Sequence, residues 1–259
     1  MNLIFLGDVF GAPGRAFLSA HLPSLIERYE ADLVIANGEN AAGGAGLTPD
    51  VAQELFSSGV DVLTSGNHIW NKKDIFPILD SERRILRPIN YPPGVPGKGS
   101  GLFQARDGKT LGVLNVCGRV FSAQDLDCPF RAMDVEIMRL RQSTPIIVVD
   151  FHAEATSEKV AAGYYVDGKV SALFGTHTHV QTADEMILPK GTAYITDAGM
   201  IGSYEGVIGV SRDIILKRFL TQLPARHEPA KGRRQLCGVF CQISGTGTAR
   251  SIQRIVIRE

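Results

Sequence analysis

Short apolar runs alternate with segments of helical periodicity along most of this chain. The runs are rich in Val, Ile, Leu and Phe, and the helical segments space apolar residues three and four positions apart. This alternation is typical of an α/β fold, in which helices connect the strands of a sheet. We expect strands at residues 2–6, 33–36, 60–64, 102–105, 111–116, 146–151, 170–174, 193–196, 237–243 and 251–257, and helices at 13–30, 49–59 and 131–141.

Local signals mark the ends of several of these elements. Thr48 followed by Pro49 predicts a helix N-cap with proline at the first helical position. Asp107-Gly108, between two apolar runs, predicts a β-hairpin. Residues 224–234 are polar and basic, so we expect a mobile, solvated loop there, with contact to a nucleotide or an RNA end as the alternative.

The composition is that of a globular protein without an electrostatic preference for polyanions. The 259 residues fit one large domain, 1–259, and 44% of them are apolar, which is ample for a buried core. The chain carries 27 Lys and Arg against 27 Asp and Glu, so nothing attracts it as a whole to nucleic acid or to an anionic membrane. Affinity for phosphate must therefore come from a local feature, such as a metal centre.

Compartment and redox state follow from the N-terminal run and the cysteines. The N-terminal apolar run, MNLIFLGDVF, lacks a basic leader and a cleavage site, so we expect no signal peptide. No uncharged apolar run approaches the ~18 residues of a membrane span. The cysteines match no common zinc pattern, and we expect them to be reduced and mostly buried in a cytoplasmic protein that does not contact membrane. They are Cys117, Cys128, Cys237 and Cys241.

Five short polar motifs each follow an apolar run directly, where a strand is expected to end. Such strand ends are where α/β folds build their sites, and glycines beside the motifs permit sharp turns close to an ion. The side chains offer oxygen and imidazole but no sulfur, which favours Mn²⁺, Fe or Zn²⁺ over a thiolate-bound structural zinc. The motifs are Gly7-Asp8, Gly38-Glu39-Asn40, Gly66-Asn67-His68, Phe151-His152-Ala153-Glu154 and Gly175-Thr176-His177-Thr178-His179.

The five motifs together are more informative than any one of them. A lone Gly-Asn-His or His-x-His also occurs in ordinary turns and surface pairs. Here four of the six histidines fall within the motifs, and all five motifs follow strands. Two nearby carboxylates have open roles: Asp150 either orients His152 or simply ends a strand, and we expect Glu154 at the start of a helix rather than as a catalytic acid.

The order of the motifs resembles the calcineurin-like metallophosphoesterase superfamily. The pattern of that superfamily runs Asp-x-His, Gly-Asp, Gly-Asn-His, His and Gly-x-His-x-His. Phe10, which has no donor atom, stands where the superfamily has its first histidine, and Glu39 stands where it has a bridging Asp. We expect the neighbouring Asn40 to supply an oxygen in place of the missing imidazole.

With these departures the chain is more specifically similar to the YmdB-like family of bacterial metallophosphoesterases, nearly from end to end. The resemblance implies an α/β fold of four layers, an α/β/β/α sandwich with mixed sheets and the site above them. We expect the second sheet to contain the Asp107-Gly108 hairpin and the two C-terminal strands. The resemblance also implies a phosphodiesterase that favours 2′,3′-cyclic nucleotides. It rests on the strings GDVFG, NGENAAGG, SGNHIW, DFHAEATSEK, GTHTHVQTAD and DAGMIGSYEGVIG.

The candidate ligands suffice for two divalent metal ions, with Fe or Mn expected and Zn as the alternative. Two ions roughly 3.5–4 Å apart can hold a bridging hydroxide that attacks phosphorus, and can clamp the phosphate oxygens. We expect Glu39 to bridge the ions, because one carboxylate offers an oxygen to each. The other expected ligands form two groups: Asp8, Asn40 and His179 for one ion, and Asn67, His152 and His177 for the other.

His68 is the expected catalytic residue. It follows a candidate ligand on a turn, where its ring can face a bound substrate. Imidazole donates protons near neutral pH, so we expect His68 to protonate the departing ribose oxygen. The alternative is a further metal ligand or a residue that orients Asp8.

The leading prediction is a hydrolase of cyclic phosphodiesters that binds a small-molecule substrate and forms a homo-oligomer. A phosphomonoesterase or nucleotidase could use the same centre, because specificity lies in the loops around a site. Outside the enzymes, the alternative is a metal-bound regulatory protein with a link to RNA degradation and little turnover. A positioned acid such as His68 argues against that alternative.

Overall fold

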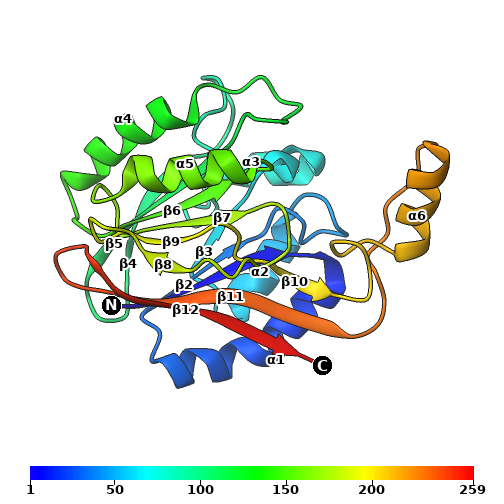
Figure 1. Ribbon diagram of the computed structural model, residues 1–259, viewed down its shortest axis with the longest axis horizontal. Helices are drawn as coiled ribbons and strands as arrows, with labels where there is room; N and C mark the ends of the chain where they lie inside the picture. The colour runs from blue at the N-terminus through cyan, green and yellow to red at the C-terminus, as the bar shows by residue number, and fades with distance from the viewer.

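The computed structural model describes residues 1–259 as two six-stranded sheets packed face to face, with helices on both outer faces (Figure 1). The strand order of the first sheet is β12-β11-β10-β1-β2-β3. In this sheet β1, β2 and β3 run parallel, so their carboxyl ends meet at one edge. The strands are β1 (Asn2–Val9), β2 (Leu33–Asn37), β3 (Val62–Thr64), β10 (Met200–Ser203), β11 (Arg234–Ile243) and β12 (Ala249–Arg258).

The second sheet has the order β4-β5-β6-β7-β9-β8. Its central strands β5, β6, β7 and β9 are parallel, while β4 and β8 pair antiparallel at its two edges. The parallel strands again bring their carboxyl ends to one edge of the sheet. The strands are β4 (Ser100–Gln104), β5 (Thr110–Cys117), β6 (Ile147–His152), β7 (Ala172–Thr176), β8 (Met186–Ile187) and β9 (Ala193–Ile195).

Helices cover the outer faces of both sheets. Helices α1 and α2 pack on the first sheet, and α4 and α5 pack on the second, whereas α6 projects from the body at the right of Figure 1. No helix is both long enough and apolar enough to cross a membrane. The helical elements are α1 (Gly11–Tyr29), α2 (Pro49–Ser57), α3 (Phe76–Leu79), α4 (Pro129–Arg141), α5 (Thr156–Val166), α6 (Arg212–Thr221) and the 3₁₀ turns η1 (Asn67–Asn71) and η2 (Lys73–Ile75).

Strand β1 explains why the central strands are apolar on both faces. Successive side chains of a strand point to opposite sides. Leu3 and Phe5 therefore face the second sheet, where the rings of Phe5 and Phe174 lie 5.0 Å apart. Ile4 and Leu6 face the helices on the other side. A strand buried on both faces needs a continuous apolar run.

The predicted fold class, a four-layered α/β/β/α sandwich with mixed sheets, is confirmed. The hairpin at Asp107-Gly108 is also confirmed, because β4 and β5 pair antiparallel on either side of it. The N-cap at Thr48 is confirmed as well: its side chain accepts a hydrogen bond from the Val51 N–H at 3.4 Å.

The expected placement of the C-terminal strands was wrong. They do not share a sheet with the Asp107-Gly108 hairpin, because β11 pairs antiparallel with β1, with Phe5 opposite Val239. Strands β11 and β12 pair antiparallel and form a second hairpin. Both hairpins contain apolar residues, and the sequence pattern alone does not determine the sheet that each hairpin joins. Strands β11 and β12 therefore form one edge of the first sheet.

Among the elements that the sequence pattern does not predict are α5, α6 and β10. The buried face of α5 includes Glu158, Lys159 and Gly163, so the helix has no apolar stripe. Only Ile215 of α6 is buried, which means that most of its apolar residues face solvent. Strand β10 is four residues long and contains a glycine, and its pairing with β1 stabilises it.

Candidate metal centre

The seven side chains expected to bind metal lie where five strands end, three from the first sheet and two from the second. Each of these side chains lies at or just beyond the carboxyl end of its strand, so the packing of the two sheets brings them together. They are Asp8 in β1, Glu39 and Asn40 after β2, Asn67 after β3, His152 in β6, and His177 and His179 after β7.

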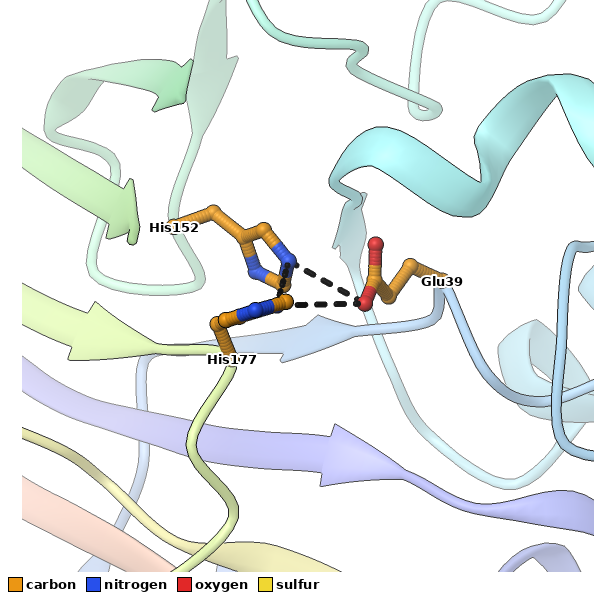
Figure 2. A group of neighbouring side chains, drawn as sticks. All are labelled: Glu39, His152 and His177. Carbon is orange, nitrogen blue, oxygen red and sulfur yellow. Dashed lines mark hydrogen bonds and ion pairs between the residues drawn. The ribbon is translucent and has the colours of Figure 1, made fainter. Parts of the chain in front are cut away.

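Glu39, His152 and His177 form the centre of this group (Figure 2). The Oε1 atom of Glu39 lies 3.1 Å from Nε2 of His152 and 4.0 Å from Nδ1 of His177. The two imidazole rings meet edge to face, with Nδ1 of His177 3.0 Å from Nε2 of His152. One atom of each side chain lies within 4.8 Å of the other two, which is a spacing that one metal ion can bridge.

Asp8 supplies the strongest sign that a cation belongs here. Its side chain is fully buried, and its Oδ1 atom has no hydrogen-bond partner. This oxygen lies 3.8 Å from Nε2 of His179 and 3.9 Å from Nδ1 of His152, whereas Oδ2 accepts a hydrogen bond from the His177 N–H. A buried carboxylate oxygen without a partner is costly unless it is protonated or coordinates a metal.

The buried ionisable groups of the centre shift one another's pKa values. Burial raises the pKa of Asp8 to about 7, although His179 and His152 oppose the rise. Burial would also raise the pKa of Glu39, but His152 outweighs it and lowers that pKa to about 2. The Glu39 and Asp8 carboxylates in turn raise the pKa of His152 to about 9 against the effect of burial. A cation that binds at Nε2 of His152 must therefore displace a proton.

His177 differs from its neighbour in charge. Burial and the adjacent His152 lower the pKa of His177 to about 3. Its ring is thus neutral at physiological pH, as a metal-binding imidazole must be.

Asn40 and His179 lie together on the side of the centre next to Phe10. The Nδ2 atom of Asn40 lies 3.2 Å from Oε1 of Glu39 and 3.1 Å from Nε2 of His179. Nδ1 of His179 donates to the carbonyl oxygen of Ile208 at 2.8 Å, which leaves Nε2 facing the centre. Phe10 packs edge to face on the His179 ring at 5.6 Å, so an apolar contact occupies the position where the superfamily pattern has its first histidine.

A chain of hydrogen bonds holds the His152 ring, and the sequence revealed only part of it. Thr176 Oγ1 lies 2.8 Å from His152 Nδ1 and donates to Asp150 Oδ1 at 2.6 Å. Asp150 is fully buried and also accepts from Asn37 and Thr64. Because the Thr176 hydroxyl donates its proton to Asp150, it accepts from Nδ1–H of His152 and leaves Nε2 for the centre. Of the two roles considered for Asp150, this contact supports orientation, through Thr176.

The turn that carries His177 and His179 is strained and held in place from behind. Both residues have positive φ, 93° and 66°, a conformation that is uncommon for residues other than glycine and that is often found at functional sites. Asp197 Oδ2 accepts from the Thr178 N–H at 3.1 Å and from Lys159 Nζ at 2.8 Å. Lys159 and Asp197 are both buried, and nothing in their sequence spacing predicted the pair.

The segment that follows β3, residues 66–68, lies against the centre. A Cβ atom on Gly66 would lie 2.2 Å from both Glu39 Oε2 and His152 Nε2, so only glycine fits. Asn67 lines a cavity together with His152 and His177. His68 is half-buried; its backbone N–H donates to Glu39 Oε2 at 3.2 Å, and its Nδ1 contacts Asn71 Nδ2 at 3.0 Å.

The expectation for Glu154 needs correction. Helix α5 begins at Thr156, so Glu154 precedes it and does not lie in its first turn. Its carboxylate instead contacts Nε2 of His177 at 3.0 Å at the exposed rim of the centre. The contact joins residues 23 positions apart in sequence, so a local helix signal could not indicate it.

Comparisons with known proteins identify the relatives of this chain. A family model described as YmdB-like protein matches residues 4–255. A Bacillus subtilis (strain 168) relative named 2′,3′-cyclic-nucleotide 2′-phosphodiesterase is 50% identical over 260 residues, covering 100% of this chain and 98% of that protein.

Solved structures share the fold. A structure described as a novel phosphatase from Mycoplasma pneumoniae matches with a TM-score of 0.94 and 35% identity, over 100% of this chain and 93% of that chain. A 5′-nucleotidase precursor from Thermus thermophilus matches with a TM-score of 0.61 and 12% identity, over 99% and 54% of the two chains, which is a likeness of fold alone. The match of the family model and the 50% identity confirm the resemblance first seen in the motifs: the chain belongs to the YmdB-like family.

Proposed function

We propose that this protein is a metal-dependent phosphodiesterase that opens the cyclic phosphate of 2′,3′-cyclic nucleotides. One observation carries the proposal: Glu39 of the first sheet meets His152 and His177 of the second, beside the unpartnered oxygen of Asp8. Membership of a metallophosphoesterase family implies divalent metal ions. The substrate class is that of the Bacillus subtilis relative at 50% identity.

The proposed centre holds two divalent ions, Fe or Mn, with Zn as the alternative. When bound, the ions supply an activated water and neutralise the charge of the phosphate. Glu39 is the proposed bridge, since its carboxylate lies between His152 and Asn40. The remaining proposed ligands are Asp8, Asn40 and His179 for one ion, and Asn67, His152 and His177 for the other.

Two amides among the proposed ligands adjust the charge of the centre. Asn40 and Asn67 are neutral, so they leave the centre more attractive to a phosphate anion than carboxylates would. The amide of Asn40 faces Glu39 and His179 through Nδ2. A half-turn about its last side-chain bond exchanges Nδ2 for Oδ1 and presents an oxygen to a cation.

His68 is the proposed general acid. Its backbone is tied to Glu39 and its Nδ1 contacts the side-chain amide of Asn71. When that amide donates to Nδ1, the ring proton resides on Nε2, where it is available to a leaving group. His68 would protonate the ribose O2′ as the P–O2′ bond breaks, which yields a nucleoside 3′-phosphate.

Turnover of diesters and monoesters by the metal-loaded protein tests the proposal. We expect 2′,3′-cyclic AMP to be converted to adenosine 3′-phosphate, identified by ³¹P NMR, and adenosine 3′- and 5′-phosphates to react far more slowly. Removal of metal with a chelator should abolish both reactions. Faster hydrolysis of the monoesters would indicate a phosphomonoesterase or nucleotidase, and no turnover of any substrate would favour a metal-bound regulatory protein.

A further inference from the structure

A cavity of about 200 Å³ adjoins the candidate metal centre on the side of His152 and His177. Asn67, His152 and His177 of the centre line this cavity. The loop that follows β5 also lines it, with Gly118, Val120, Phe121 and residues 122–124. The rest of a molecule whose phosphate is bound at the centre can therefore occupy this cavity and contact the loop.

Phe121 is the most conspicuous side chain of the loop, because 85% of its surface is exposed. It is the third residue of a turn that the Ser122 N–H closes onto the Arg119 carbonyl oxygen at 3.1 Å. Its φ of 62° is the left-handed conformation that such a position usually reserves for glycine or asparagine. A phenylalanine that is exposed in a strained turn contributes little to the stability of the folded chain, so its presence points to a bound ligand.

The turn is fixed relative to the metal centre. The buried carboxylate of Glu158 accepts the Arg119 N–H at 3.0 Å and the Val120 N–H at 3.1 Å. The Gly118 N–H donates to the carbonyl oxygen of His152 at 2.9 Å. The backbone that presents the phenyl ring is thus bonded to the strand that carries a proposed metal ligand.

We propose that Phe121 is the platform on which the base of a nucleotide substrate stacks while the phosphate lies at the metal centre. The proposal rests on the proposed function and names the part of the substrate that the protein recognises outside the phosphate. Every nucleobase has a flat π-face, so a stacking platform accepts all four. The protein should accordingly discriminate weakly among bases and strongly against cyclic phosphates that lack one.

Steady-state kinetics of Phe121→Ala tests this role with two substrates, 2′,3′-cyclic AMP and 1-O-methylribose 2′,3′-cyclic phosphate, which has no base. For cyclic AMP we expect KM to rise about tenfold or more, with kcat and metal content unchanged. The substrate without a base should react as it does with the wild type, and Phe121→Trp should restore the KM for cyclic AMP. Phe219→Ala on α6 is the matched control, since Phe219 is also largely exposed but lies outside the cavity.

The outcomes separate this proposal from the proposed function. An unchanged KM for cyclic AMP in Phe121→Ala, or an equal change for both substrates, overturns the stacking role. If the wild type hydrolyses neither substrate, the proposed function fails. The stacking role is then tested by calorimetric binding of adenosine 3′-phosphate and of ribose phosphate to the wild type and to Phe121→Ala. A selective loss of about tenfold in nucleotide affinity supports stacking; equal affinities, or no binding by the wild type, contradict it.

Discussion

The Nε2 atom of His152 lies 3.1 Å from Oε1 of Glu39, although strands β6 and β2 belong to different sheets. The contact exists only when the two sheets are packed against each other. Neither sheet therefore contains the centre by itself. Because metal binds the folded arrangement and not the unfolded chain, bound ions should stabilise the packing of the two sheets.

Glu39→Gln tests the bridging role. We expect the variant to lose both ions, because an amide has one neutral oxygen and cannot offer a charged oxygen to each ion. Elemental analysis of protein purified without added metal is the measurement. Glu136→Gln is the control, since Glu136 is a buried carboxylate that contacts Ser100 and Arg139 instead of the centre. A fully metallated Glu39→Gln protein would rule out the bridge.

Thr176→Val tests whether Thr176 positions the His152 ring. The substitution preserves shape but removes the hydroxyl that joins His152 to Asp150. Metal affinity should fall by about 10–100-fold, the usual loss when a partner of a metal-binding histidine is removed. Thr192→Val, a buried threonine near the opposite end of β7, should leave affinity unchanged. Titrations with a competing chelator measure both variants, and equal affinities would contradict the positioning role.

Asp8→Asn should stabilise the metal-free protein at high pH. The pKa of Asp8 is about 7 in the folded chain, against about 3.9 when unfolded. The folded state thus holds this proton more tightly, so the free energy of unfolding decreases as pH rises from about 4 to 7. At pH 8 the metal-free variant should be more stable than the metal-free wild type by a few kcal/mol, at about 1.4 kcal/mol per pKa unit.

Urea denaturation of chelator-treated proteins measures this difference. The advantage of Asp8→Asn should shrink at pH 5, where the folded wild type is already protonated at Asp8. With saturating metal the order should reverse, because only the wild type gains the full binding energy. A wild type that is more stable without metal at pH 8 would show that Asp8 is not an unsatisfied charge.

His68→Ala separates acid catalysis from metal binding. The variant should retain its ions and its KM for 2′,3′-cyclic AMP while kcat falls by about 10²–10⁴. The loss should be smaller for a nitrophenyl phosphodiester, because that leaving group departs without a proton. Equal losses on the two substrates, or loss of metal, would remove the acid role and leave His68 as a ligand or a binding residue. His21→Ala, a histidine on α1 beside Phe17, is the control.

The sequence was sufficient to locate the candidate centre because each of its parts carries a local signal. Asp8, Glu39 and His152 follow apolar runs that end in or beside glycine or a short turn, and the structure brings them together as expected. The parallel strands were recognisable for the same reason, since burial on both faces requires an uninterrupted apolar run.

The support behind the centre was not predictable, because it depends on contacts between distant residues. Lys159 and Asp197 are 38 positions apart, and each looks like an ordinary surface charge until the fold buries both. Thr176 occupies an unspecified position of the Gly-x-His-x-His pattern, yet its hydroxyl orients a histidine on the neighbouring strand. The sheet that received β11 was likewise decided by its pairing with β1.

A metal titration of turnover tests whether the protein is a metal-dependent phosphodiesterase. Protein stripped with a chelator would receive Mn²⁺ or Fe²⁺ in steps while hydrolysis of 2′,3′-cyclic AMP is followed. We predict no turnover without metal and a rise that reaches its plateau at two ions per chain. Turnover that is undiminished in the stripped protein, or absent once two ions are bound, would contradict a metal-dependent phosphodiesterase.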